Sequence, residues 1–222
     1  MLLTNPDGPP HQRHSQILVP NDAPGVDVVR ALPVFGYQHQ EGHCEIQFTD
    51  VRVPVTNVLG DEGGGFAIAQ ARLGPGRIHH CMRSIGVAEK ALELMVRRGL
   101  NREAFGKPLA QLGANYDIIA ESRMKIEMAR LLCLKAAYMM DTVSPREAAP
   151  WISQIKVIAP RIALEITDEA VQMHGAMGIT QDTPLAHMWT HLRTLRLADG
   201  PDAVHRRQVA RAELKRYTNQ KM

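Results

Sequence analysis

An aspartate beside a glycine stands out in the segment RLADGPDAVHRR, residues 196–207. Asp199 precedes Gly200 in a short break between two helical patterns, and a loop of this kind can present a carboxylate as a general base. The simpler interpretation is that Asp199 or Asp202 places negative charge at the N-terminus of the next helix. Considered alone, the residues favour this simpler role, and both interpretations remain open.

Two further segments contain residues that suit a nucleotide or another anion. The glycines of QMHGAMGIT, residues 172–180, could let the backbone approach a ligand closely, although glycines at a helix end more often serve as C-caps. In NREAFGKPL, residues 101–109, Arg102 precedes a Gly-Lys-Pro turn. An arginine in this position suits a pyrophosphate, but it is equally ordinary as a surface residue.

The histidines do not form a recognisable metal-binding pattern. His187 and His191 are four residues apart on a predicted helix, and His79 and His80 are adjacent. There is no HExxH motif, no nearby third ligand and no cysteine pair. We therefore expect surface or packed histidines and no metal.

The charge pattern and hydropathy of the chain predict no nucleic-acid partner and no transmembrane segment. The 222 residues carry a formal net charge of +3 with both signs well mixed. The basic face formed by Arg207, Arg211 and Lys215 has no interleaved aromatic residues, so we expect it to be solvated. No apolar stretch reaches the roughly 20 residues of a membrane span, and the N-terminus has no signal-peptide pattern. Three widely spaced cysteines indicate reduced thiols in an intracellular protein.

The strand-like runs are confined to the first part of the chain. They cover residues 15–20, 25–32 and 44–54, and they predict a small antiparallel sheet that is too small to form a domain alone. Helical periodicity begins after residues 60–66, and the low aromatic content of 5% also favours a mainly helical protein.

Four or five helices follow, which is enough for a bundle. We expect Gly74-Pro75-Gly76 to interrupt the start of the first helix and Pro160 to kink the third. Thr183-Pro184 and Gly200-Pro201-Asp202 predict the starts of two more. The apolar positions in steps of three and four are Ile78, Met82, Ile85, Leu92 and Met95 in the first helix; Met124, Met128, Leu131, Leu134 and Tyr138 in the second; and Ile155, Ile158, Ile162 and Ile166 in the third.

Five segments, taken in order, resemble the acyl-CoA dehydrogenases: FTDVRVPVTNVLG, GGGFAIAQARLGPGR, NREAFGKPL, QMHGAMGIT and RLADGPDAVH. LGPGRIHHCMR and RLADGPDAVH look most similar to family members ten and eleven, a branch associated with long-chain, branched or 4-hydroxy acyl-CoAs. The resemblance implies a mainly α fold, with a partial antiparallel middle β-domain at 1–60. It also implies a C-terminal four-helix up-down bundle at 61–222, which binds FAD and holds the catalytic base.

In this family a carboxylate removes the α-proton of an acyl-CoA while the β-hydrogen leaves as hydride to FAD, giving a trans-2-enoyl-CoA. The resemblance gives the role of base to Asp199, one methylene shorter than the glutamate of many members. It also implies that the amides of Asp199 and Gly200 bind the thioester oxygen and that Arg77 tunes Asp199. The implied acyl-CoA contacts are Gly74, Pro75, Gly76, Arg77 and Gly200; the implied FAD contacts are Arg102, Gln172, Met173, His174, Gly175, Ala176, Pro201, Asp202 and Ala203.

Further expectations follow from the same resemblance. Arg102 would meet the FAD of a neighbouring subunit, which implies a homo-oligomer, a dimer or a tetramer. Electron-transfer flavoprotein is the expected acceptor. The expected location is the mitochondrial matrix or peroxisome in a eukaryote and the cytoplasm in a bacterium.

The chain also departs from the family pattern. Gly113 stands where many members have a flavin-contacting glutamine, and Ala176 replaces the second glycine of a usual pair. The family's N-terminal helical domain has no counterpart before residue 1, so we expect a fragment, a short isoform or one part of a larger protein. Two alternatives therefore stay open: a flavin oxidase of the same superfamily, and a non-catalytic oligomerisation or interaction module.

Overall fold

The computed structural model describes residues 1–37 and 43–218. Backbone contacts divide the chain into two compact units, Met1–Leu73 and Gly74–Met222. The first long helix, α1 (Gly65–Asn101), begins in the first unit and continues into the second.

The first unit contains two small antiparallel sheets. β2 (His14–Ile17) pairs with the short strands β1 (Leu2–Leu3) and β5 (Val58–Leu59), whereas β3 (Val26–Ala31) pairs with β4 (Cys44–Phe48). A short 3-10 helix, Val55–Asn57, precedes β5. The prediction of a single small sheet is therefore wrong, because two-residue strands are too short to leave an alternating pattern in the sequence.

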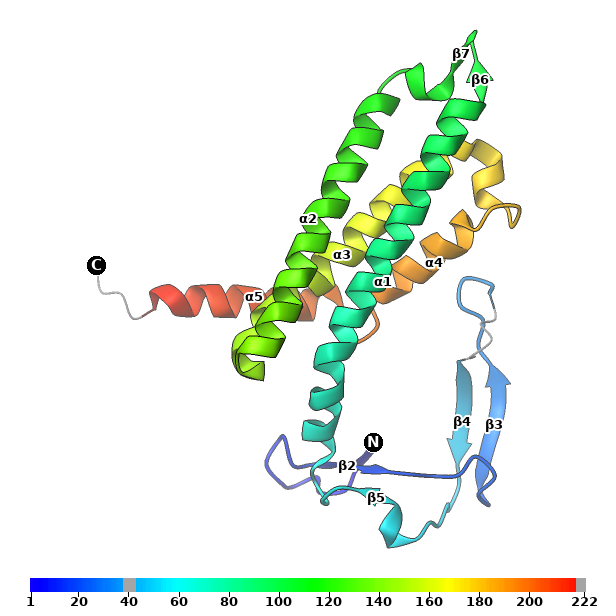
Figure 1. Ribbon diagram of the computed structural model, residues 1–222. Helices are drawn as coiled ribbons and strands as arrows, with labels where there is room; N and C mark the ends of the chain where they lie inside the picture. Colours follow the sequence, from blue (N-terminus) through cyan, green and yellow to red (C-terminus); the bar gives the residue numbers. More distant parts are fainter. Residues whose placement is uncertain (38–42, 219–222) are drawn as a thin grey trace. The chain divides into compact units, whose positions relative to one another are not determined.

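Four helices of the second unit form the predicted up-down bundle. α1, α2 (Asn115–Thr142), α3 (Pro145–His174) and α4 (Leu185–Leu195) run in alternating directions (Figure 1). α5 (Asp202–Tyr217) packs on α3 and then extends away from the bundle (Figure 1). The mainly α architecture expected from the sequence is confirmed.

Short elements connect the bundle helices. The hairpin of β6 (Glu103–Ala104) and β7 (Lys107–Pro108), followed by a 3-10 helix at Leu109–Gln111, joins α1 to α2. A further 3-10 helix, Gly175–Ile179, follows α3. α4 begins after Pro184 and α5 after Pro201, close to the predicted helix starts, and Thr183 Oγ1 accepts a hydrogen bond from the Leu185 amide at 3.4 Å.

α3 is the central helix of the bundle. A capping box starts it: Ser144 Oγ accepts from the Glu147 amide at 3.4 Å, and Glu147 Oε2 accepts from the Ser144 amide at 3.2 Å. Ile155, Ile162 and Ile166 of the predicted apolar stripe are buried, and Ile158 packs against them half-buried. The helix continues through Pro160 without a break.

α1 also continues through Gly74-Pro75-Gly76, so the predicted interruption is wrong. A proline within a helix lacks one amide hydrogen bond but keeps a φ that the helix tolerates, and packing outweighs the local penalty of the two glycines. The predicted stripe on α1 lies against the core, where Ile85, Leu92 and Met95 are buried.

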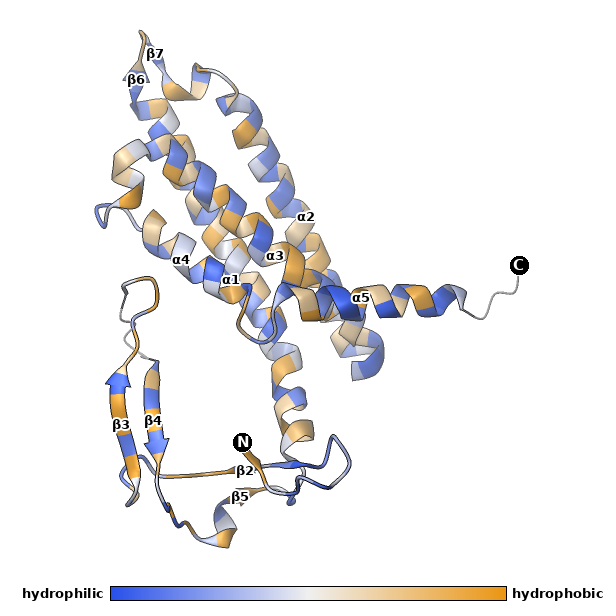
Figure 2. Ribbon diagram, turned by 180° about the vertical axis from the view of Figure 1, so that it is seen from behind, coloured by the Kyte–Doolittle hydropathy of each residue, from blue (hydrophilic) through white to orange (hydrophobic). Residues whose placement is uncertain are grey.

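α2 has two apolar faces. Its core face consists mostly of small residues, including Ala129, Cys133 and Ala136, which allow close helix packing. The stripe of large side chains found in the sequence lies on the other face. Figure 2 shows apolar positions recurring along the length of α2. The members of this outer stripe are 51–65% exposed: Met124, Met128, Leu131, Leu134 and Tyr138.

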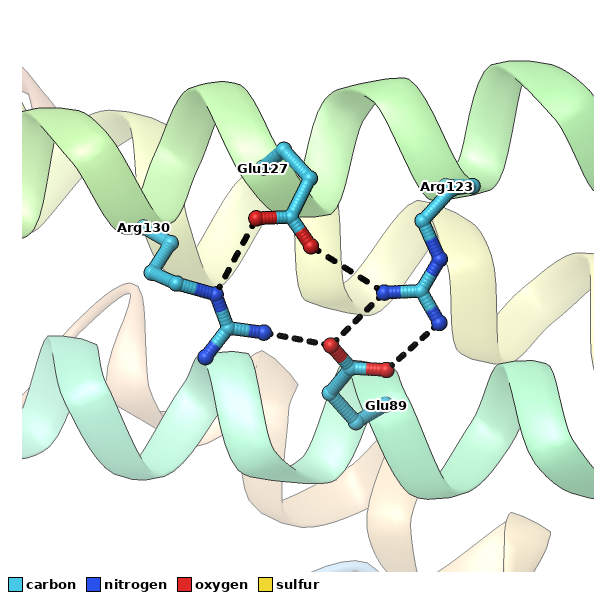
Figure 3. Close-up of polar contacts among 4 residues, drawn as sticks. All are labelled: Glu89, Arg123, Glu127 and Arg130. Carbon is cyan, nitrogen blue, oxygen red and sulfur yellow. Dashed lines mark hydrogen bonds and ion pairs between the residues drawn. The ribbon is translucent and has the colours of Figure 1, made fainter.

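A charged network joins α1 to α2 (Figure 3). Arg123 donates from both terminal nitrogens to Glu89, at 2.8 Å each, and Arg130 pairs with the same carboxylate. Glu127 contacts both arginines, at 3.2 and 3.3 Å. Glu89 and Arg123 also line an open groove between these helices, and Asp199 is not among the residues that line it.

Candidate active site

Asp199 lies in the short turn between α4 and α5 with a backbone φ of +54°. This left-handed conformation costs most residues about 1–2 kcal/mol, and aspartate is one of the few that tolerate it. Strained backbone positions often occur at functional sites when the surrounding structure holds them. The turn therefore needs specific tethers.

Two side chains from distant parts of the sequence hold the Asp199 carbonyl. Arg77 Nε of α1 donates to it at 3.0 Å, and His205 Nε2 of α5 lies 3.3 Å from the same oxygen. Burial lowers the pKa of His205, which is 2% exposed, below its usual value. α1 and α5 thus hold the turn from separate directions.

A fully buried lysine holds both ends of the turn. Lys156 of α3 donates from Nζ to the carbonyl of Leu195 at 2.5 Å and to that of Gly200 at 3.5 Å. Burial lowers its pKa, and the nearby carboxylates of Asp199 and Asp202 partly oppose this effect. The interior lysine thus fixes the end of α4 relative to the start of α5.

His80 of α1 lies beside the Asp199 carboxylate. Nε2 of His80 lies 3.0 Å from Oδ2 of Asp199, and the two side chains are 21% and 17% exposed. The contact lacks hydrogen-bond geometry, so Oδ2 is buried without a hydrogen-bond partner among the described residues. A buried polar atom without a partner requires an explanation, and a catalytic role is one of the recognised ones.

Gly200 is required by the shape of the turn. Its φ is +106°, and a Cβ at this position would lie 2.9 Å from His205 Nε2. Within the described parts of the chain, the amides of Asp199 and Gly200 donate no hydrogen bond. Two adjacent free N–H groups beside a carboxylate suit an oxygen that gains negative charge.

The structure brings Gly76, Arg77 and Gly200 of the predicted acyl-CoA site together at Asp199. Gly76 lies against the carboxylate, because a Cβ added there would be 3.9 Å from Asp199 Oδ2. Arg77 reaches the Asp199 carbonyl, and Gly74 and Pro75 lie in the preceding turn of α1. Gly76, Arg77 and Gly200 therefore lie around Asp199, whereas a Cβ added at Gly74 would meet Met140 of α2 instead.

The Asp202 carboxylate places negative charge at the N-terminus of α5 and also forms an ion pair with Arg196. It stands in the first turn of α5, where negative charge is favourable. Its Oδ2 accepts from Arg196 Nε and Nη2, at 2.9 and 2.7 Å. The simpler role considered for this segment thus fits Asp202, whereas Pro201 and Ala203 beside it are exposed.

The other predicted FAD residues lie at the opposite end of the bundle helices. Arg102 directly follows the C-terminal end of α1. The offset of 25 residues between it and Arg77, at a rise of about 1.5 Å each, separates the two by about 37 Å along the helix axis. Gln172, Met173 and His174 end α3, and Gly175 and Ala176 begin the next turn. Figure 1 places this turn and the β6–β7 hairpin at the same end of the bundle. One chain therefore does not bring Arg102 to Asp199.

The end of α3 offers a surface that a nucleotide could approach. Gln172, Gly175 and Ala176 are exposed, whereas Met173 and His174 are buried and His174 Nδ1 contacts the Ala170 carbonyl at 2.8 Å. Gly175 has a φ of +65°, and a Cβ added there would meet no atom within 4 Å. Arg102 is exposed and forms no ion pair within the described residues. An open backbone turn and an available cation fit the pyrophosphate and adenosine part of FAD.

Three polar residues around Asp199 were not identified from the sequence: His80, Lys156 and His205. The sequence did give an indication of Lys156, because a lysine between Ile155 and Val157 in an apolar stretch of helix is expected to be buried with hydrogen-bond acceptors. It also gave one of His80, since His80 lies three residues after Arg77 and so shares its helix face. In the residues that the structure describes, no group of three or more potential metal ligands occurs, nor is any helix long and apolar enough to cross a membrane.

Comparison with known proteins identifies the family. A model of the acyl-CoA dehydrogenase C-terminal domain matches residues 63–214. The chain is 57% identical to a Mycobacterium tuberculosis protein named probable acyl-CoA dehydrogenase FadE2, with 97% of this chain and 53% of that protein covered. It is 51% identical to rat acyl-CoA dehydrogenase family member 11, covering 95% of this chain and 27% of that protein.

A solved structure shows the same architecture. A Mycobacterium abscessus chain assigned to the acyl-CoA dehydrogenases superposes with a TM-score of 0.94 at 50% identity, covering 96% of this chain and 53% of that one. The chain thus spans about half the length of these mycobacterial relatives. The domain match, the sequence identity and the shared fold together show that the chain belongs to the acyl-CoA dehydrogenase family.

Proposed function

We propose that this chain provides the catalytic base and part of the cofactor and substrate sites of an FAD-dependent acyl-CoA dehydrogenase, with Asp199 as the base. The observation that carries the proposal is the turn between α4 and α5, which side chains of other helices hold in place around Asp199. A carboxylate on a left-handed backbone has one buried oxygen without a hydrogen bond, and three side chains from α1, α3 and α5 hold the surrounding carbonyls.

Asp199 takes the α-proton of the acyl-CoA, so the Cα–H bond breaks and its electron pair forms the new double bond. The rigid turn favours this step, because catalysis depends on near-attack geometry more than on contact alone. Negative charge builds on the thioester oxygen as the proton leaves. The amides of Asp199 and Gly200, which donate no hydrogen bond within the described residues, would donate to it.

FAD, when bound, accepts the hydride that leaves the β-carbon, giving the trans-2-enoyl-CoA. Gln172, Gly175 and Ala176 would border its adenosine side, and Arg102 would pair with the pyrophosphate bound to a neighbouring subunit. Pro201, Asp202 and Ala203 would approach the cofactor near the base. Electron-transfer flavoprotein is the acceptor that we expect for the reduced cofactor.

The decisive variant is Asp199→Asn in the FAD-loaded protein. It keeps the shape of the side chain and the tolerance of a left-handed φ but removes basicity. We expect loss of flavin bleaching by a long-chain acyl-CoA under anaerobic conditions, with flavin content unchanged. Asp141→Asn on the exposed side of α2 is the matched control and should behave like the parent. Turnover above a few per cent of the parent in the Asp199 variant would reject Asp199 as the base.

The same preparation separates the two alternatives. Stoichiometric hydrogen peroxide during aerobic turnover would indicate a flavin oxidase with the same base. A colourless protein that forms a stable oligomer would indicate a non-catalytic interaction module, and the exposed stripe on α2 would then be its main functional surface.

A further inference from the structure

His80 is the polar side chain that faces the carboxylate of Asp199. It lies three residues after Arg77 on α1, so both side chains point from one helix face toward the same turn. Arg77 contacts the backbone of Asp199, whereas His80 Nε2 lies 3.0 Å from Oδ2. The two residues therefore act on different parts of the aspartate.

A neighbouring arginine determines which nitrogen of His80 carries the proton. Arg83 Nη2 lies 2.6 Å from His80 Nδ1. A guanidinium has only donors, so Nδ1 must accept, and a neutral imidazole that accepts at Nδ1 carries its hydrogen on Nε2. That hydrogen is on the nitrogen beside Asp199.

The surroundings favour the neutral ring. Burial lowers the pKa of His80 below its usual value; Asp199 opposes this, whereas Arg83 and Lys156 add to it. The charged groups that act on the ring come from α1, α3 and the turn: Arg83, Lys156 and Asp199. Arg77 of α1 and His205 of α5 contact the carbonyl of the same aspartate. Because burial outweighs the attraction of Asp199, a second proton on His80 is disfavoured.

We propose that His80, held in its Nε2–H tautomer by Arg83, is a positioning residue that directs the Asp199 carboxylate by donating to Oδ2 and leaves Oδ1 to take the α-proton. This inference rests on the proposed role of Asp199 as base. The present contact lacks hydrogen-bond geometry, and such contacts at catalytic groups commonly align only when substrate binds. A small rotation of the ring would satisfy the buried oxygen.

A neutral donor suits this task better than a cation. A charged imidazolium would stabilise the ionised carboxylate strongly and so weaken it as a base. A neutral N–H fixes the oxygen with a smaller loss of basicity. Because misplacement by about 1 Å can cost on the order of a hundredfold in rate, orientation of a short aspartate should have a measurable effect.

The kinetic test compares His80→Leu, which removes the donor, with His80→Gln, which keeps an N–H donor. In the FAD-loaded protein we expect at least a tenfold lower kcat for His80→Leu, little change in KM, and a larger isotope effect with an α-deuterated acyl-CoA. His80→Gln should recover most of that loss. His79→Leu, at the exposed adjacent position, is the control and should match the parent.

A spectroscopic test needs neither FAD nor turnover. Nitrogen-15 NMR of the 222-residue chain, with His80 assigned by the signal lost in His80→Gln, should show protonated Nε2 and bare Nδ1 at pH 7. Arg83→Met removes the donor to Nδ1, so His80 should then take up a second proton at a higher pH than in the parent. A protonated Nδ1 in the parent at pH 7 overturns the proposal.

The outcomes distinguish this inference from the function on which it rests. If Asp199→Asn keeps its turnover, the base assignment fails and the role of His80 fails with it. If the parent is active, Asp199→Asn has no turnover and His80→Leu has the same kcat as the parent, only the His80 proposal fails. Equal losses in His80→Leu and His80→Gln would show a packing role and would also overturn it.

Discussion

Arg77 holds the backbone of Asp199 rather than its carboxylate: the guanidinium Nε donates to the carbonyl oxygen at 3.0 Å across 122 positions of sequence. Burial lowers the pKa of Arg77, and the negative charge of Asp199 partly opposes this effect. The expectation from the family resemblance was electrostatic tuning. The geometry adds a conformational role, because the hydrogen bond stabilises the left-handed turn.

Gly200 should not tolerate a side chain. In Gly200→Ala the methyl group would approach His205 Nε2 at a φ of +106°, so we expect a loss of about 1–3 kcal/mol in unfolding free energy and impaired turnover. Urea denaturation measures the first effect. Gly86→Ala is the control: with no atom within 4 Å and a helical position, it should stabilise the protein by about 0.5–1 kcal/mol. Equal changes in unfolding free energy for Gly200→Ala and Gly86→Ala would show that glycine is not required at position 200.

Lys156 should be essential to the turn. Lys156→Met keeps the length of the apolar stem but leaves the buried Leu195 carbonyl without its donor, which we expect to cost about 1–3 kcal/mol. Lys125→Met on α2 removes a partly exposed ion pair with Glu165 and should change stability by less than about 1 kcal/mol. Thermal denaturation of the two variants provides the comparison. Similar melting temperatures would mean that the Lys156 contacts are dispensable.

Stability should fall on the acid side of neutrality. Burial lowers the pKa of His80 and of His205, so below the ordinary histidine value of about 6.5 the unfolded chain binds more protons than the folded one. The unfolding free energy therefore decreases as pH falls from 6.5 toward the folded-state pKa values. Urea curves between pH 5 and 8 measure the slope. His205→Gln should flatten it, whereas a slope unchanged in both His205→Gln and His80→Gln would contradict this assignment.

The outer stripe of α2 should form a subunit contact. Leu131 and Leu134 are 65% and 51% exposed, and an apolar stripe of this size is costly to leave in water. Leu131→Glu with Leu134→Glu should dissociate the oligomer, as measured by analytical ultracentrifugation, without unfolding the subunit. Glu121→Lys, at an exposed polar position of α2, should not. A parent that is already monomeric would exclude the stripe as a homo-oligomer contact.

The core helices could be predicted from the sequence because their large buried residues repeat with helical spacing, as at Ile155, Ile162 and Ile166. The same reasoning did not reveal the core face of α2. There Ala129 and Ala136 are buried, whereas the larger Leu131 and Leu134 face outward. A search for large apolar residues at helical spacing therefore finds the exposed face of α2 instead of its core face. The division near residue 60 between a β-domain and a helical domain stays a prediction.

The site was only partly predictable for a different reason. Asp199 and Gly200 are adjacent in sequence, and their local pattern suggested a loop carboxylate. His80 and Lys156 come from other helices, and only the packing of α1 and α3 brings them to the turn. Adjacent histidines in a helix have many ordinary uses, and the local signal that distinguished His80 from His79 was its spacing of three residues from Arg77.

The left-handed backbone at Asp199 has a consequence for protein engineering. A φ of +54° favours glycine, asparagine and aspartate, so it selects the short acid over glutamate before any substrate is considered. Lengthening this carboxylate by one methylene would place a disfavoured residue in a turn whose carbonyls are tethered from three helices. A designer who wants a glutamate here would first have to rebuild residues 196–201, and the side chain and its loop should therefore be exchanged between relatives only as one cassette.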